Sequence, residues 1–167
     1  NTSGPVAIRY PRGKGEGVSL SSPQTIAWGK GELLREGKDL LILAAGTVVN
    51  SALQAAEKLS WQGINAAVIN ARFVKPLDEE LIINWAEKCG RVLTVEENIL
   101  NGGFGSGVME LFEQKGLSFP LKRLGIDDCF VEQGTRLEKL ACYGLDVEGI
   151  FENAFSFSAD RVVKEVK

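Results

Sequence analysis

A continuous apolar run in the first half of the chain constrains the fold more than any other feature. The run spans residues 40–45 with the sequence LLILAA and ends directly at Gly46-Thr47. A strand that is buried on both faces has such a run, whereas a strand with one wet face alternates apolar and polar residues. The run therefore predicts a central strand of a parallel sheet that leads into a turn and a helix.

The rest of the chain alternates further strands with helices. Strands are expected at 64–70, 91–96 and 119–124, and helices at 48–61, 78–88, 105–114, 135–143 and 147–157. Asp78 is expected to cap the second helix, and Pro120, which lacks an N–H, favours an edge position for the last strand. This order predicts the α/β class, a three-layer sandwich with a mostly parallel, mixed sheet.

The first 34 residues follow a different pattern. Residues 6–10 alternate apolar and polar side chains and predict an extended strand, in which Arg9 faces away from Ile8 toward solvent. A Gly-, Lys- and Ser-rich stretch at 11–23 is typical of a linker, so the main domain is expected over 24–167. Residues 26–28 and 32–34 are expected to form a β-hairpin that supplies an antiparallel edge strand.

Composition excludes several classes of protein. The 167 residues are 44% hydrophobic and 25% charged, with a net charge of −3, which suits a globular domain without affinity for nucleic acid or anionic membranes. No signal peptide is visible, and no apolar run reaches the roughly 20 residues of a membrane-spanning helix. The three cysteines lack metal-type spacing and are expected to be reduced core thiols of a cytosolic protein.

Two further features bear on catalysis by this chain. Histidine, the commonest general base, is absent from the sequence. The start at Asn1 is expected to mark a fragment.

Charged residues gather at the ends of two expected strands. Arg72 and Lys75 follow the strand at 64–70, and Glu96 and Glu97 lie at the end of the strand at 91–96. Open α/β sheets place ligands or partners at such carboxyl ends. Neighbouring side chains of an extended chain point to opposite faces, so the two glutamates are not expected to share a proton or a metal. We expect one of them to pair with Arg72 or Lys75 in a structural or interdomain salt bridge; the alternative is a solvated loop.

The glycine-rich loop at 102–107, GGFGSG, leads into a helix and allows two interpretations. Backbone N–H groups at a helix N-terminus attract anions, which would favour a nucleotide-binding α/β protein. However, the spacing is not G-x-G-x-x-G and no Walker lysine follows. Tight turn geometry is therefore the favoured interpretation.

Five short motifs occur in an order typical of one family: GPVAIRYPRG at 4–13, RFVKPLD at 72–78, TVEEN at 94–98, GGFGSG at 102–107 and QGT at 133–135. Together they resemble the C-terminal domain of the 1-deoxy-D-xylulose-5-phosphate synthase family, within the transketolase superfamily, over nearly the whole chain. The resemblance implies a transketolase C-terminal-like domain at 24–167. It also makes 1–23 the end of the preceding pyrimidine-binding domain plus a linker. The family favours proline in place of Asp127 and near Glu132, so the loop there is expected to differ.

The resemblance implies an activity for a longer protein. Family members decarboxylate pyruvate on thiamine diphosphate and join the two-carbon unit to glyceraldehyde 3-phosphate, and the product feeds isoprenoid, thiamine and pyridoxal synthesis. Their thiamine diphosphate and Mg2+ are held by a Gly-Asp-Gly…Asn segment, which is expected upstream of Asn1. This chain alone is therefore expected to bind neither cofactor and to be inactive. By resemblance, Arg12 holds the substrate phosphate, a role that suits a guanidinium fork.

The implied partners are the pyrophosphate- and pyrimidine-binding domains of the same chain and a second subunit of a homodimer, in the cytoplasm or, in a plant, the plastid stroma. The expected interdomain or dimer contacts are Arg72, Lys75, Glu96 and Glu97. The aromatic residues near strand ends that favour a dimer are Phe73, Phe104 and Phe130. The alternatives are the C-terminal domain of transketolase or of a 2-oxoacid dehydrogenase E1 β subunit, and a non-catalytic interaction module. The motifs YPRG and RFVKPLD together favour the synthase.

Overall fold

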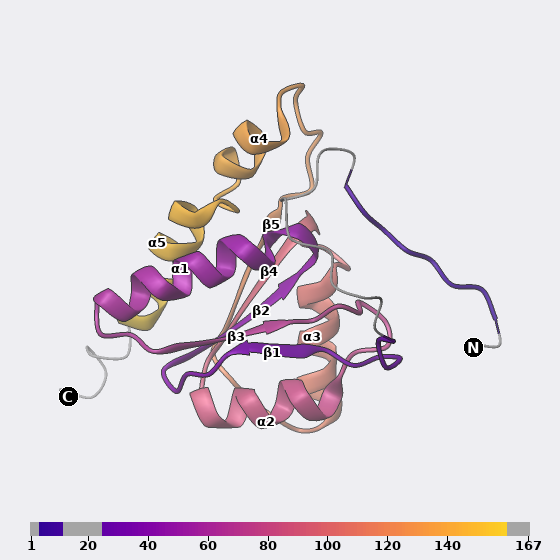
Figure 1. The fold of residues 1–167 in the computed structure, drawn as a ribbon. Helices are drawn as coiled ribbons and strands as arrows, with labels where there is room; N and C mark the ends of the chain where they lie inside the picture. The colour runs from indigo at the N-terminus through magenta and orange to yellow at the C-terminus, as the bar shows by residue number, and fades with distance from the viewer. Residues whose placement is uncertain (1–3, 12–24, 160–167) are drawn as a thin grey trace.

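The computed structural model describes residues 4–11 and 25–159, and its centre is a five-stranded sheet (Figure 1). The strands lie in the order β1-β3-β2-β4-β5, with β1 antiparallel to β3 and every other neighbouring pair parallel. The predicted mixed, mostly parallel sheet is thereby confirmed. The strands are β1 (Glu32–Arg35), β2 (Leu40–Ala45), β3 (Ala66–Asn70), β4 (Val92–Ile99) and β5 (Leu121–Ile126).

Helices cover both faces of the sheet and make the predicted three layers (Figure 1). On one face lie α1 (Val49–Trp61), which follows the short 3-10 turn η1 (Gly46–Val48), and the two C-terminal helices α4 (Arg136–Cys142) and α5 (Val147–Ala159). On the other face lie α2 (Glu79–Cys89) and α3 (Phe104–Gln114).

Strand β2 contributes to both hydrophobic cores, which explains its unbroken apolar sequence. Leu40, Ile42 and Ala44 pack toward α1 and α5, and Leu41 and Leu43 pack toward α2 and α3. All five side chains are fully buried. Because successive side chains of a strand point to opposite faces, a polar residue anywhere in this run would be buried in one core or the other.

Side-chain caps fix where two helices begin. Asp78 caps α2, as predicted, by accepting a hydrogen bond from the Leu81 backbone N–H at 3.3 Å. Thr135 and Glu138 form a capping box at the start of α4, in which each side chain binds the backbone N–H of the other residue. This capping box sets the position of Arg136, the first residue of α4.

Two predictions about the first 34 residues are wrong. The hairpin does not form, because residues 26–28 are not a strand: the Lys30 N–H donates to the Ala27 carbonyl in a turn, and Trp28 packs edge-on against Phe73 instead. The antiparallel edge strand is formed by β1 alone. Residues 6–10 pair with none of the described strands through backbone hydrogen bonds.

Candidate functional site

The carboxyl edge between β2 and β4 is the point where the chain connections leave the sheet in opposite directions. From β2 the chain crosses to β3 on one side, and from β4 it crosses to β5 on the other. Open α/β sheets bind ligands in the crevice that such divergence creates. Here the loop after β2 contributes Thr47, and β4 contributes Glu97.

A side chain of the protein itself occupies this crevice. The Arg136 guanidinium donates to the Thr47 hydroxyl and to the Glu97 carboxylate, with which it forms an ion pair. The Glu97 side chain is only 17% exposed. We call these three residues the Glu97 cluster. It joins segments that lie far apart in the sequence and ties α4 to the carboxyl edge of the sheet.

Two cations act on the Glu97 carboxylate. Burial raises the pKa of Glu97 above its ordinary value, and the positive charges of Arg136 and then Arg9 lower the pKa part of the way back. Arg9 also donates from its guanidinium to the Glu97 backbone carbonyl at 3.3 Å. Our expectation that Arg9 only faces solvent is therefore incomplete, because this exposed side chain also contacts β4.

Glu96 has a different environment from its neighbour. Its side chain is 2% exposed, and its carboxylate accepts the backbone N–H groups of Phe104 at 2.7 Å and Gly105 at 2.8 Å. A carboxylate there stabilises the positive end of the α3 dipole and satisfies two otherwise free donors. The two glutamates thus bind separate partners, which is the expected behaviour of neighbours in a strand.

The glycine-rich loop is filled by its own contacts. A Cβ at Gly103 would lie 2.4 Å from a Glu96 carboxylate oxygen, so only glycine fits there. The Ser106 hydroxyl and the Arg123 guanidinium both donate to the Leu100 carbonyl at 2.8 Å. The Glu96 carboxylate already accepts the N–H groups of Phe104 and Gly105, so these two donors are not available to a phosphate. Tight turn geometry therefore remains the favoured explanation of the glycines.

The predicted salt bridge between a glutamate of β4 and Arg72 or Lys75 is wrong. Arg72 pairs with Glu32 of β1 instead, and its backbone takes a positive φ of 55°. The prediction failed because it treated strands that are consecutive in sequence as neighbours in the sheet. Strand β2 lies between β3 and β4 and separates the two sets of charges. Lys75 is exposed in the loop between β3 and α2.

The predicted site residues are therefore dispersed. Arg12 lies outside the described residues. Among the aromatic residues expected to favour a dimer, Phe104 is 2% exposed and packs in the core, so its proposed role as a surface contact is wrong. Phe130 is fully exposed in the loop between β5 and α4, and Phe73 is half-buried against Trp28.

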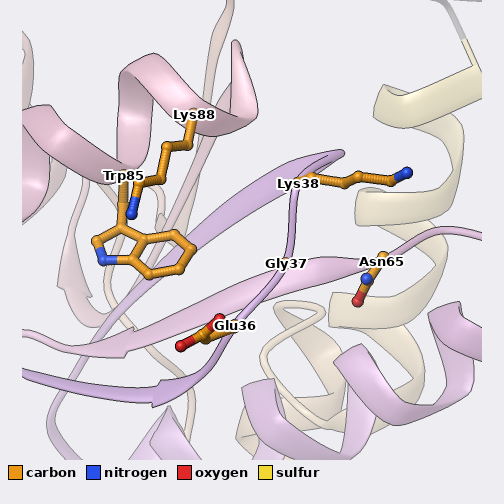
Figure 2. A pocket seen from close by; sticks show the side chains of 6 residues that line it. All are labelled: Glu36, Gly37, Lys38, Asn65, Trp85 and Lys88. Carbon is orange, nitrogen blue, oxygen red and sulfur yellow. The ribbon is translucent and has the colours of Figure 1, made fainter.

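A shallow hollow lies at the opposite, amino edge of the parallel strands (Figure 2). Its volume is about 450 Å3. Figure 2 shows Lys88 reaching over the ring of Trp85, 4.1 Å from the ring centroid, whereas Lys38 points away from it. Ligands of open α/β sheets bind at the carboxyl edge, so the position of this hollow does not favour it as the functional site.

Two further findings concern metals and membranes. Across residues 4–11 and 25–159, no three or more Cys, Asp or Glu side chains come together in a way that would hold a metal ion. No described helix has the length and apolar character needed to span a membrane. All three cysteines are free, but only Cys89 is buried, so the expectation of core thiols is wrong for Cys129 and Cys142.

Comparison with known proteins identifies the family of this domain and several relatives of the chain. A family model described as transketolase, C-terminal domain, matches residues 29–150. A Geobacter metallireducens protein named 1-deoxy-D-xylulose-5-phosphate synthase 1 is 51% identical over 156 residues, which cover 92% of this chain and 25% of the relative. A Halothermothrix orenii protein named 1-deoxy-D-xylulose-5-phosphate synthase is 49% identical over 97% of this chain and 26% of its own length. The chain thus spans about a quarter of the length of these curated relatives.

Solved structures show the same domain. A split gene transketolase, described as an inactive beta4 tetramer, is similar with a TM-score of 0.75 and 34% identity, over 80% of this chain and 44% of that chain. A mutant transketolase from Pichia stipitis shares the fold, with a TM-score of 0.54 and 21% identity over 78% of this chain and 18% of that chain. Together with the mixed sheet and its motifs, the family match shows that the chain belongs to the transketolase C-terminal domain family.

Proposed function

We propose that this chain is the C-terminal part of a 1-deoxy-D-xylulose-5-phosphate synthase. The observation that carries the proposal is the identity of about one half, over almost the whole chain, to relatives that bear this name. The longer protein would join pyruvate and glyceraldehyde 3-phosphate to give 1-deoxyxylulose 5-phosphate and CO2, in the cytoplasm or a plastid stroma. The product would enter isoprenoid, thiamine and pyridoxal synthesis.

The described residues at the start of α3 do not fit the diphosphate of thiamine diphosphate. The amino end of α3 is the place where backbone N–H groups of the glycine-rich loop converge, and the Glu96 carboxylate fills it. A diphosphate there would meet a buried negative charge. We therefore assign cofactor binding to the pyrophosphate- and pyrimidine-binding domains of the longer protein, and we propose that this chain alone is inactive.

Arg12 is the residue proposed to contact substrate. Its guanidinium can form two parallel hydrogen bonds to the phosphate of glyceraldehyde 3-phosphate. Support comes from the resemblance of its YPRG motif to that of the synthase family.

The test uses the longer protein with Arg12→Ala, and with Arg12→Lys as the matched variant that keeps the charge. We expect Arg12→Ala to raise the KM for glyceraldehyde 3-phosphate roughly 10- to 100-fold, which corresponds to a charged hydrogen bond of about 1.5–3 kcal/mol. The KM for pyruvate should stay the same. Unchanged kinetics with intact folding would refute the substrate role and favour a non-catalytic interaction module.

Dimerisation is also a proposal. Exposed apolar side chains at the carboxyl edge and its loops, Trp28, Val74 and Phe130, offer a contact surface, with Arg72 and Lys75 as charged neighbours. The 34% identical split gene transketolase is described as a beta4 tetramer, so a protein that contains a related domain forms an assembly. Sedimentation velocity of the longer protein with and without Val74→Asp tests this proposal, since a monomeric wild type would contradict it.

A further inference from the structure

A continuous exposed segment, residues 127–138, joins β5 to the first turn of α4. Every residue in this segment is exposed, and α4 as a whole contributes no buried side chain. Figure 1 shows that the loop before α4 extends beyond the end of the sheet. Segments with few buried contacts open locally at a small cost in free energy. We call residues 127–138 the α4 lid.

The α4 lid is anchored at its two ends. It leaves the sheet after Ile126, the last residue of β5, and beyond it Leu140 and Tyr143 pack against the core on the α1 face. The Cys129 thiol and the Tyr143 hydroxyl lie 3.4 Å apart, so the loop is also linked to the end of α4. Between these ends the Leu137 side chain is 75% exposed. Apolar packing therefore holds the ends of the lid more firmly than its middle.

Arg136 ties the α4 lid to the edge of the sheet. Its guanidinium donates to the Thr47 hydroxyl and to the Glu97 carboxylate. Within the part of the chain that the structure describes, no other lid side chain hydrogen-bonds or ion-pairs with β2, β4 or the turn after β2. The attachment of the lid at the crevice between β2 and β4 thus depends on a single side chain.

The charges around Glu97 indicate how firmly this attachment holds. Burial raises the pKa of Glu97, and the positive charges of Arg136 and then Arg9 lower the pKa only part of the way back. The two cations therefore offset only part of the cost of burying the carboxylate. If Arg136 is removed, the carboxylate favours an open lid, because water can then solvate it.

We infer that the α4 lid opens and closes over the crevice between β2 and β4, and that the Arg136 guanidinium is the latch that keeps the lid closed. An open lid exposes the Glu97 carboxylate and the Thr47 hydroxyl at the carboxyl edge, where open α/β sheets bind ligands or partners. One ion pair within the domain then controls access to this crevice. The inference does not depend on the proposed function.

Hydrogen–deuterium exchange of the longer protein, read by mass spectrometry, measures the opening of the lid. Helix α4 has seven residues, too few for a stable isolated helix, so its amides lose protection when the lid detaches. We expect Arg136→Met to raise the exchange rate of the α4 amides roughly tenfold, about the effect of losing one charge-assisted hydrogen bond. Amides of β4 and α5 should change by less than about twofold. Lys139→Met is the matched control, because it removes a positive charge from the same helix and leaves the latch intact.

A double variant separates the latch from a general loss of stability. Adding Glu97→Gln to Arg136→Met removes the uncompensated buried charge, so α4 exchange should return to within about threefold of the wild type. Glu97→Gln alone should have a smaller effect than Arg136→Met, because the Arg136 side chain is 38% exposed and can turn toward water.

Three results would overturn the inference. The first is an Arg136→Met variant whose α4 amides exchange at the wild-type rate or at the rate of the Lys139→Met control. The second is an increase of equal size in α4, β4 and α5, which indicates that the whole domain is destabilised. The third is a double variant whose α4 amides exchange as fast as those of Arg136→Met, or faster, since the buried Glu97 charge would then not drive opening.

Discussion

Replacing Glu96 with glutamine tests whether a buried carboxylate stabilises the start of α3. The carboxylate accepts two buried N–H groups, from Phe104 at 2.7 Å and Gly105 at 2.8 Å. Glutamine has nearly the same volume, but its NH2 group faces one of these donors, so one charged hydrogen bond of about 1.5–3 kcal/mol is lost. The loss of negative charge at the helix N-terminus adds about 0.3–1 kcal/mol. We expect the free energy of unfolding to fall by about 2–4 kcal/mol.

Urea unfolding of the chain, followed by far-UV circular dichroism, measures this change. Glu110→Gln is the control, because it makes the same chemical change at an exposed position of the same helix. Thermal unfolding should shift downward by roughly 5–15 °C for Glu96→Gln, since each kcal/mol corresponds to about 2–4 °C in a chain of this size. A Glu96→Gln variant within about 0.5 kcal/mol of the Glu110→Gln variant would refute the reasoning, because surface substitutions have effects of that size.

Two more predictions concern glycines and a thiol. Gly105→Ala should lower the free energy of unfolding by about 1–3 kcal/mol, because the added Cβ would lie 2.5 Å from the buried Thr94 hydroxyl. Gly107→Ala in the same helix should raise the free energy of unfolding by about 0.5–1 kcal/mol, because the atom nearest to its added Cβ is 3.9 Å away. Equal effects in urea unfolding would contradict this difference. Burial raises the pKa of Cys89 from 9.0 to about 11. As the pH rises, the thiol therefore ionises in the unfolded chain before it ionises in the folded chain. The contribution of Cys89 to the free energy of unfolding should be constant below pH 9 and should fall between pH 9 and 11. Cys89→Ala should lack that extra fall, and at pH 8 a thiol reagent should modify exposed Cys129 long before Cys89.

Features that depend on local patterns were predictable from the sequence. The unbroken apolar run of β2 predicted a strand buried on both faces, and both cores indeed meet on it. Asp78 predicted the start of α2 because capping depends only on residues three positions away. Pro120 predicted an edge position for β5, which pairs with β4 alone. In each of these cases the physical cause lies within a few residues of the effect.

Features that depend on strand order were not predictable. The pairing of Glu97 with Arg136 bridges 39 positions, and the contact of Arg136 with Thr47 bridges 89. No periodicity in the sequence connects such residues. The prediction of a salt bridge with Arg72 was wrong for the same reason, because no pattern in the sequence indicates that β2 lies between β3 and β4. Arg136 follows the QGT motif directly, and this position at the start of a capped helix is the signal that points to it.

The two outer strands of the sheet have a consequence for how copies of this domain meet. Strand β1 is four residues long and its register shifts between Leu33 and Arg35. Strand β5 begins after a proline and carries the charged Lys122 and Arg123. Short, irregular or charged borders of this kind discourage the addition of a further strand from another molecule. Neighbouring copies therefore gain little by continuing one another's sheets, and an assembly of this domain depends on side-chain surfaces that mutation can alter one residue at a time.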